Sequence, residues 1–412
     1  MTTSSDMAME ARDLLNRLKK QIPSSLLEIE RQYFINDKIL SKLTLPEVEA
    51  LRNYMNDILM LMRDYEASDI EMGGSSANCH IWLRIKGEKS PAEQFGRFDI
   101  DDFSILILCV LAPEQREQLF EKLSYDFSYT IMGLGDTRIR YRACVYFELG
   151  DIALNMRAIN AKIRSYESYG FGMNVTKMFS LEHTKAGLVL VTGITGSGKS
   201  TTLDAIVDMN NETVEGHIVI IARPIEFVHR SKKCIVRQRE VGMDTLSFKN
   251  GTIEALRQDP DIIVIGEMRD SQTIMSALEA ADSGHKVLST LHTSSAVESL
   301  DRIVGEVPPI EQERVRNRLA DTLKCVVSQK LVVGRNSQVQ LVKEILVMTP
   351  SIKAAIRNNN TSEIYQMISE GTKYGMMTLE QDLKRFVRQR KISAETAIKF
   401  ANNKRRMQQL LN

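Results

Sequence analysis

One short run constrains the fold of this chain more than any other part of the sequence. Residues 193–200 read Gly-Ile-Thr-Gly-Ser-Gly-Lys-Ser, which matches the phosphate-binding pattern G-x-x-x-x-G-K-[ST] at every fixed position. The apolar run Leu188–Val191 leads into it, and a helical pattern follows from Lys199. A loop of this kind works between a strand and a helix N-terminus, because backbone N–H groups and the helix dipole then face the phosphates. The run therefore predicts an α/β nucleotide-binding domain.

The residues of this loop have separate predicted tasks. The glycines allow close approach of the backbone to phosphate, Lys199 is expected to reach the β- and γ-phosphates, and Ser200 is expected to hold Mg²⁺. ATP and Mg²⁺ are therefore the predicted cofactors. The predicted nucleotide-binding residues are Gly193, Ile194, Thr195, Gly196, Ser197, Gly198, Lys199, Ser200 and Thr201.

A second acidic site follows along the chain. Residues 261–267 read Asp-Ile-Ile-Val-Ile-Gly-Glu, an apolar strand that ends in a carboxylate. In P-loop enzymes such an acid lies beside the γ-phosphate, where it can orient or deprotonate the attacking water. Glu267 is therefore a predicted catalytic residue. Gly266 stands where an aspartate is usual, so Mg²⁺ would depend more on Ser200 and water.

The hydrophobic pattern divides the chain into stretches. From Gly187 onward, short apolar runs alternate with helical patterns, which predicts βαβ units and a mostly parallel sheet. The predicted strands are Gly187–Val191, His217–Ile221, Asp261–Ile265 and Lys286–Leu291. After about Pro350 the chain is polar and helical. Ala394–Leu411 reads as one closing helix, and its cluster Lys404–Arg406 reads as a solvated face.

The first part of the chain has a different character. Residues 67–165 predict a small α+β domain, with strands near Ile81–Ile85 and Arg138–Phe147 and a helix around Pro113–Leu123. Residues 1–66 look helical. Val48, Leu51, Met55, Ile58, Met62 and Tyr65 form an apolar stripe, with Pro46 in the first turn. We expect the stripe to pack on its own protein rather than on a partner.

Charge and cysteine content exclude several classes. The 54 Lys and Arg against 53 Asp and Glu leave a net charge of +1, so no direct nucleic-acid partner is expected. The five cysteines are scattered without a Cys-x-x-Cys pair, which is typical of reduced thiols in a cytosol. The N-terminus lacks a secretory pattern. The longest apolar run, near Phe103–Ala112, is too short for a bilayer, which needs about 20 residues.

Several sequence boxes together resemble the ATPases of secretion systems and type IV pili, especially the twitching-motility PilT/PilU type. After the phosphate-binding run (187–202) come Pro-Ile-Glu-Phe-Val-His at 224–229 and Gln-Arg-Glu-Val-Gly at 238–242. Asp-Pro-Asp-Ile-Ile-Val-Ile-Gly-Glu-Met-Arg-Asp at 259–270, Gly-His at 284–285 and Leu-His-Thr-Ser-Ser-Ala at 291–296 complete the set.

This resemblance implies a domain order. It comprises a PAS-like domain (67–165), a linker (166–186), a RecA-like ATPase domain (187–350) and a C-terminal helical region (351–412). The helical extension 1–66 lies outside the resemblance.

The resemblance also implies residue roles. Glu226 matches the acid of the family's aspartate box, a second candidate for water activation, and Glu267 matches the Walker B glutamate. His292 and His285 match the histidine box, where a histidine senses the γ-phosphate. Arg140 and Arg157 match arginines that the N-terminal domain offers toward a nucleotide. For His229 we expect only packing against a strand.

Members of this family work as ATP-hydrolysing hexameric rings. The resemblance implies a homohexamer that drives pilus retraction through an inner-membrane platform protein, in the cytoplasm and peripheral at the inner membrane. A paralogous pilus ATPase is a further candidate partner. Assembly ATPases carry a four-cysteine zinc insert and a long extra N-terminal region, and the lack of both points to the retraction type.

Three departures from the family pattern leave alternatives open, and one is the helical extension 1–66, which could recruit a partner that the typical family member does not use. Ala222-Arg223-Pro224 stands where the family has Glu-Asp-Pro, and Ser351–Arg357 only partly matches the motif tied to retraction. Arg223 could weaken Mg²⁺ binding, substitute for metal charge, or point outward into a salt bridge. A weakly hydrolysing, nucleotide-gated assembly partner is therefore one alternative function. A type IV secretion or conjugation motor is another, although the charge balance disfavours direct DNA translocation.

Overall fold

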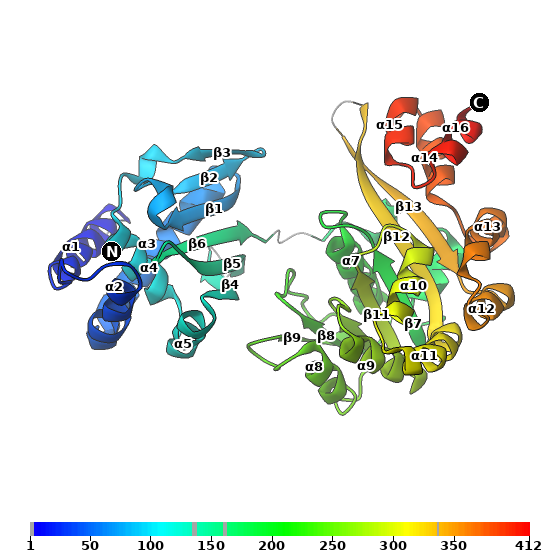
Figure 1. The fold of residues 1–412 in the computed structure, drawn as a ribbon, viewed down its shortest axis with the longest axis horizontal. Helices are drawn as coiled ribbons and strands as arrows, with labels where there is room; N and C mark the ends of the chain where they lie inside the picture. Colours follow the sequence, from blue (N-terminus) through cyan, green and yellow to red (C-terminus); the bar gives the residue numbers. More distant parts are fainter. Residues whose placement is uncertain (1–3, 134–137, 160–162, 336–337) are drawn as a thin grey trace. The chain divides into compact units, whose positions relative to one another are not determined.

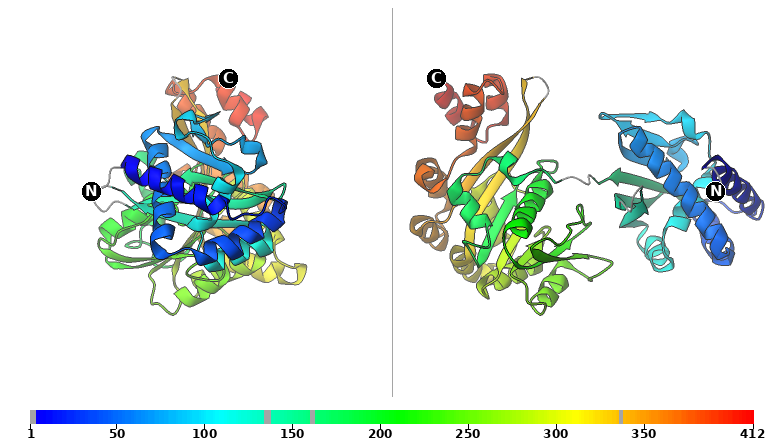
Figure 2. Two further views of the ribbon diagram at one scale, coloured as in Figure 1. Left: turned by 90° about the vertical axis from the view of Figure 1, so that its left-hand side faces the viewer. Right: turned by 180° about the vertical axis from the view of Figure 1, so that it is seen from behind.

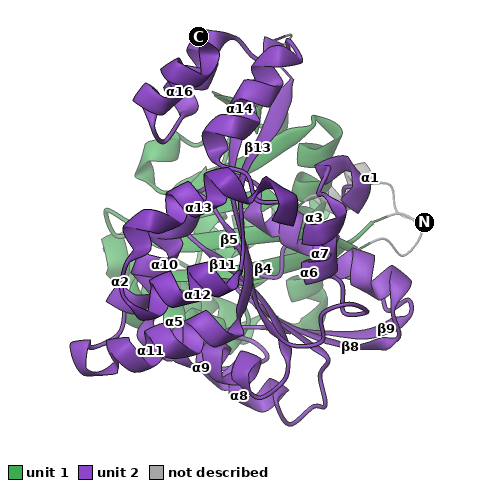
Figure 3. Ribbon diagram, turned by 90° about the vertical axis from the view of Figure 1, so that its right-hand side faces the viewer, with its two compact units in different colours: residues 1–161 green, residues 162–412 purple. Residues whose placement is uncertain are grey.

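The chain forms two compact units, residues 1–161 and residues 162–412, in a computed structural model that describes residues 4–133, 138–159, 163–335 and 338–412 (Figure 3). We call them unit 1 and unit 2 and describe each by itself. The finer predicted boundaries at 66, 165, 186 and 350 stay predictions. Across the described ranges, no helix combines the length and the apolar character that a membrane crossing requires.

Unit 1 is built on a six-stranded antiparallel sheet with the order β3-β2-β1-β6-β5-β4 (Figure 1). Buried residues alternate along β5, where Ile139, Tyr141, Ala143 and Val145 face the core. The predicted PAS-like character of this unit stays a prediction. The strands are β1 Ala67–Gly73, β2 Trp82–Ile85, β3 Glu88–Pro91, β4 Ser124–Met132, β5 Arg138–Glu148 and β6 Asp151–Ala158.

Helices cover one face of this sheet in two layers. The second view in Figure 2 shows the long α3 lying across the strands, with α1 outside it. Leu51, Met55, Ile58 and Met62 of α3 are buried in the same hydrophobic core as the sheet, which confirms that the stripe packs on its own protein. Tyr65 lies beyond the helix and is exposed. The helices are α1 Ser4–Lys19, α2 Glu28–Phe34, α3 Leu45–Asp64, α4 Ile100–Val110 and α5 Pro113–Lys122.

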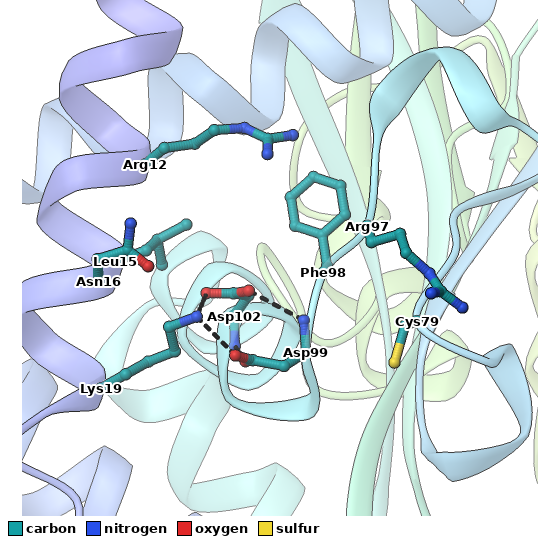
Figure 4. Close-up of a pocket in the computed structure, with 9 residues that line it drawn as sticks. All are labelled: Arg12, Leu15, Asn16, Lys19, Cys79, Arg97, Phe98, Asp99 and Asp102. Carbon is teal, nitrogen blue, oxygen red and sulfur yellow. Dashed lines mark hydrogen bonds and ion pairs between the residues drawn. The ribbon is translucent and has the colours of Figure 1, made fainter.

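An open cavity of about 430 Å³ lies between α1 and the start of α4 (Figure 4). The Lys19 ammonium pairs with Asp99 at 2.6 Å and with Asp102 at 2.8 Å. Arg12 donates to the Tyr54 hydroxyl and to the Phe95 carbonyl, and its guanidinium stacks over the Phe98 ring. These contacts fasten the first helix to the rest of unit 1.

Unit 2 is built on a seven-stranded sheet with the order β13-β12-β7-β11-β10-β8-β9. All neighbouring strands are parallel except the hairpin β12–β13, as the sequence pattern predicts for a mostly parallel sheet. The strands are β7 Gly187–Thr192, β8 Gly216–Ala222, β9 Cys234–Glu240, β10 Ile262–Ile265, β11 Lys286–Leu291, β12 Leu323–Val333 and β13 Val339–Val347.

Helices cover both faces of this sheet. Figure 3 shows α6 and α7 on one side and α8 to α13 on the other, which follows from right-handed crossovers between parallel strands. The helices are α6 Met173–Phe179, α7 Lys199–Thr213, α8 Phe248–Ala255, α9 Ser271–Asp282, α10 Ala296–Gly305, α11 Pro309–Thr322, α12 Pro350–Arg357 and α13 Ile364–Glu370.

Three short helices close the chain: α14 Leu379–Arg388, α15 Ala394–Phe400 and α16 Lys404–Leu411. The prediction of one closing helix over Ala394–Leu411 is therefore wrong. The backbone N–H of Asn403 donates to Glu380 Oε1, and its side chain accepts from Arg406 N, so a new helix starts there. The three helices pack around a separate small core that includes Leu383, Phe386 and Met407.

The segment that precedes β7 is tied to the centre of unit 2. The Tyr169 hydroxyl donates to the carbonyl of Thr201 in α7 at 3.0 Å. The buried Lys343 ammonium of β13 donates to the Tyr169 carbonyl and lies 4.6 Å from the centre of the Phe171 ring. The start of unit 2 is thereby fastened to both a helix and a strand.

Candidate nucleotide site

The phosphate-binding run forms a tight loop between β7 and α7, as predicted. Gly196 and Gly198 have φ angles of 78° and 84°, a region that favours glycine. A Cβ at Gly193 would lie 2.5 Å from the Gln329 carbonyl oxygen. Gln329 of β12 also donates from Nε2 to the Ser197 carbonyl at 2.8 Å and accepts from the Thr202 hydroxyl. The sheet therefore holds the loop from below, while Ile194, Thr195 and Gly196 stay exposed.

Lys199 is a nearly buried cation at the start of α7. Its Nζ donates to the Ile194 carbonyl at 3.1 Å, and it forms no ion pair with any residue in the described ranges. Burial lowers the pKa of Lys199, while the charges of Glu267 and Glu226 oppose that shift. A buried cation without a carboxylate partner suits an anionic ligand. The loop and Lys199 therefore fit the triphosphate of a nucleotide.

Glu267 lies just beyond the end of β10, next to the loop. β10 pairs with β11, and β11 pairs with β7, so the carboxyl ends of these strands share one edge of the sheet. The Glu267 carboxylate pairs with Arg269 Nε at 2.9 Å and lies 3.6 Å from His292 Nε2. The Met268 N–H donates to the Thr290 carbonyl, which fixes the turn that carries Glu267.

The two histidines of the histidine box lie at opposite ends of β11. His292 follows the strand and faces Glu267, whereas His285 precedes the strand and interacts with Ser283 at 3.0 Å. Burial lowers the pKa of His292, and the positive charge of Lys199 adds to that effect. Only His292 is therefore placed beside the phosphate-binding loop.

Strand β9 forms hydrogen bonds to the loop that carries Glu226, both before and after that residue. The Glu240 carboxylate accepts from the Ile225 N–H at 3.1 Å. Two residues earlier, on the same face of β9, Gln238 accepts from the His229 N–H at 2.8 Å and donates to the Phe227 carbonyl at 2.6 Å. The sequence alone assigns no role to the box at 238–242, because the contacts of its side chains depend on the pairing of β8 with β9.

His229 connects the same loop to the phosphate-binding helix. Its side chain is fully buried, and Nε2 lies 3.1 Å from Asp204 Oδ1 in α7. Burial raises the pKa of Asp204, and the His229 contact opposes that shift. The loop of Glu226 and the helix that begins at Lys199 are therefore joined directly.

The residues that depart from the family pattern also lie at this edge. Ala222 ends β8, and Arg223 is exposed and forms no ion pair with the described residues. The outward salt bridge considered for Arg223 is thus not formed within the described chain. Gly266 leaves little space, because an added Cβ would lie 3.3 Å from the Ile221 carbonyl oxygen. Ser200 stays the predicted Mg²⁺ ligand at the start of α7.

Arg140 and Arg157 belong to unit 1. Arg140 lies in β5, and Arg157 lies in β6, where its Nε pairs with Asp69 at 2.7 Å. Two-thirds of the Arg157 side chain is exposed. The predicted role of both arginines toward a nucleotide stays a prediction.

Comparisons with known proteins agree with this geometry. The family model described as "Type II/IV secretion system protein" matches residues 135–409. The "Type IV pilus retractation ATPase PilT" of Pseudomonas aeruginosa is 43% identical over 292 residues, 71% of this chain and 83% of that protein. A "Twitching motility protein" of Neisseria gonorrhoeae is 36% identical over 352 residues, 85% of this chain and 92% of that protein.

A solved structure is also similar. "Crystal Structure of the Pilus Retraction Motor PilT and Bound ADP" matches with a TM-score of 0.77 and 35% identity, covering 86% of this chain and 98% of that chain. The chain therefore belongs to the type II/IV secretion system protein family and is an ATPase of its pilus retraction type.

Proposed function

We propose that this chain hydrolyses ATP to drive retraction of a pilus. The observation that carries the proposal is the shared sheet edge where Lys199 lacks a carboxylate partner and Glu267 is held by Arg269 and His292. The similarity to a pilus retraction motor supports retraction, rather than extension, of the pilus. The ring of six copies, the inner-membrane platform partner and the cytoplasmic location at the membrane are parts of this proposal.

The chemistry follows from the residues at this edge. Backbone N–H groups of residues 193–201 and the Lys199 ammonium bind the phosphates and offset their charge. Glu267 orients a water molecule and accepts its proton as the water oxygen bonds to the γ-phosphorus and the bond to the β–γ bridging oxygen breaks. Ser200 would hold Mg²⁺, which supplies further charge neutralisation. Glu226 would assist from the loop that β9 holds, and Arg140 and Arg157 would offset phosphoryl charge.

Steady-state ATP hydrolysis by the purified chain tests the proposal. We expect Lys199→Ala to abolish ATP binding and turnover, because it removes the phosphate-facing cation. Glu267→Gln should retain ATP binding but lose about 10²-fold to 10⁴-fold in turnover, the usual contribution of a general base.

His292→Ala and His285→Ala form a matched pair, since the two histidines flank the same strand. We expect a loss of turnover for His292→Ala and wild-type turnover for His285→Ala. A Lys199→Ala protein with wild-type turnover would contradict the proposed site. Normal pilus retraction in cells that carry Lys199→Ala would contradict the motor role.

A further inference from the structure

The positive charge of this chain is concentrated at its C-terminal end. Unit 1 holds 19 Lys and Arg against 25 Asp and Glu, whereas unit 2 holds 35 against 28. Residues 379–412 alone hold nine Lys and Arg against three Asp and Glu. Two of those three acids, Glu380 and Asp382, are buried, so most of the exposed charges on α14–α16 are positive. The net charge of +1 conceals this asymmetry.

One edge of this basic region contacts the β12–β13 hairpin just after the end of β12. The Arg335 N–H donates to the Lys391 carbonyl at 2.8 Å. The backbone is equally close at Gly334, where an added Cβ would lie 2.6 Å from the same carbonyl oxygen. Figures 1 and 2 show the hairpin reaching the level of α14–α16. We call Val333, Arg335, Val339, Arg388, Arg390 and Lys391 the hairpin edge.

The cations of the hairpin edge form no ion pair within the described chain, and Lys391 contacts the Phe386 ring, whose centre lies 5.6 Å from Nζ. Arg335, Arg388, Arg390 and Lys391 are exposed, and none forms an ion pair with another described residue. Arg385 differs, because it pairs with the buried Asp382 at 2.6 Å. Exposed cations on neighbouring segments repel one another, and a polyanionic surface would reduce that repulsion.

The same edge also exposes apolar side chains. Val333 and Val339 are directly paired across the hairpin and are 61% and 54% exposed. Exposed apolar side chains flanked by Lys and Arg are typical of segments that lie at a lipid interface. A nucleic acid would instead favour exposed aromatic residues for stacking, and the nearby Phe386 and Phe400 pack into the C-terminal core.

We propose that the hairpin edge is a peripheral membrane-contact surface that binds bilayers rich in anionic phospholipid. Arg335, Arg388, Arg390 and Lys391 contact the phosphate headgroups, and Val333 and Val339 enter the interfacial layer. The rest of the basic surface, including Lys404, Arg405 and Arg406, adds long-range attraction. This surface lies outside the nucleotide site, and its binding to lipid does not require hydrolysis.

Flotation with vesicles tests the proposal on the full-length protein without nucleotide. The probes are vesicles of phosphatidylcholine alone and vesicles with about 30% phosphatidylglycerol, a fraction typical of a strongly anionic leaflet. We expect binding to the anionic vesicles only, with release at high salt, because screening weakens the attraction. Absence of binding to anionic vesicles at low salt would overturn the proposal.

Charge reversal locates the surface. We expect Arg335→Glu/Arg390→Glu/Lys391→Glu to weaken vesicle binding by about 100-fold or more, since each basic residue near an anionic leaflet contributes about a factor of five. Lys20→Glu/Lys38→Glu/Lys42→Glu is the matched control. It makes the same change in net charge at exposed unit 1 lysines without a described ion pair, and it should bind as the wild type does. Equal loss in both variants would overturn the assignment.

Two further measurements exclude other occupants. Val333→Asn/Val339→Asn should weaken vesicle binding, and wild-type binding by this variant would overturn contact with the lipid interface. A duplex DNA that the wild type binds more tightly than anionic vesicles would overturn lipid as the ligand. If the triple reversal at the hairpin edge changes the sedimentation coefficient instead of vesicle binding, the surface is a contact between copies and the proposal fails.

Discussion

The Gln238 side chain forms hydrogen bonds to the residues on either side of Val228, in the loop that carries Glu226. Its amide oxygen accepts from the His229 N–H, and its amide group donates to the Phe227 carbonyl. The neighbouring Glu240 holds Ile225 in the same way. Glu226 itself is exposed, and these contacts hold the loop that carries it.

We expect Gln238→Leu to lower kcat about tenfold while the KM for ATP stays within about twofold. The substitution keeps the volume but leaves two backbone groups unpaired, a cost of about 1–3 kcal/mol that displaces the loop. The phosphate-binding loop is untouched, so binding of ATP should persist. Steady-state kinetics over a range of ATP concentrations makes this measurement.

Two companion variants control for other effects. Gln238→Glu retains an acceptor for the His229 N–H but cannot donate to Phe227, so an intermediate kcat is expected. Arg237→Ala alters the opposite face of β9 and should leave both constants unchanged. A Gln238→Leu protein with wild-type kcat would show that the loop does not need this contact.

The sequence could predict where the phosphate-binding loop and Glu267 lie in the fold but not which side chains hold them. The loop at 193–200 and Glu267 follow from local patterns, because a strand, a turn and a helix start suffice to place them. Gln329 and Gln238 lie far along the chain from the residues they support, and their contacts arise only from the order of strands in the sheet. His285 matches a family box by sequence, yet the length of β11 separates it from the site.

Elements whose pattern is local were predicted well, and elements defined by a partner were not. The helix around the Val48–Tyr65 stripe and the four central strands of unit 2 were predicted close to their observed bounds. The hairpin β12–β13 was missed because its antiparallel pairing continues a parallel sheet. The single closing helix was wrong because Glu380, in another helix, bonds the chain at Asn403.

Strand β13 is joined to the start of helix α10 through a buried carboxyl group. Glu344 is 2% exposed and accepts from the Ala296 N–H at 2.7 Å. Burial raises the pKa of Glu344 to about 7, the nearby Glu380 adds to the rise, and Lys330 opposes it. The group therefore holds its proton in the folded chain at a pH where an unfolded chain has lost it.

This shift predicts that the contribution of Glu344 to stability falls as pH rises. Below the unfolded pKa the carboxyl group is protonated in both states, and between that value and about 7 only the folded state holds the proton. We expect Glu344→Gln to gain thermal stability relative to the wild type as the pH is raised from 5 to 8. The difference in melting temperature between the two proteins, followed against pH by circular dichroism, makes the comparison.

A hydrogen bond that Glu344→Gln loses at every pH does not affect the test. The test uses only how the difference in melting temperature between variant and wild type changes with pH. Glu363→Gln, which removes an exposed carboxylate of the same unit, is the matched control for the change from Glu to Gln. A flat difference for Glu344→Gln would contradict a raised pKa at this position.

The whole molecule consists of two units that each bury their own hydrophobic core. The core of unit 1 combines residues of α1, α3 and α4 with those of the sheet, and the main core of unit 2 surrounds the parallel sheet. Residues 4–66 are thus part of a folded unit and not an appended tail. A unit with its own core is expected to unfold on its own.

We expect two thermal unfolding transitions. A bound nucleotide should raise the transition temperature of unit 2 only. A non-hydrolysable ATP analogue at 100 times its dissociation constant should add about 2.7 kcal/mol to unit 2, a shift of roughly 5–10 °C. Differential scanning calorimetry with and without the analogue resolves the two transitions. Lys199→Ala should remove the shift.

The complementary variant addresses the other unit. Leu59→Ala opens a cavity in the core of unit 1, because Leu59 is fully buried. This variant should lower the transition temperature of unit 1 only, which is the transition that the ATP analogue does not shift. One transition that responds to both the analogue and Leu59→Ala would contradict independent units.

The fastening of Tyr169 to α7 has a mechanical consequence. The chain enters unit 2 through a segment bonded to the carbonyl of Thr201, within the first turn of the helix that follows the phosphate-binding loop. Lys343 holds the other side of this segment to the sheet. A displacement of that first turn by a bound phosphate would therefore pass directly to the chain that enters unit 2, because Tyr169 is bonded to the turn.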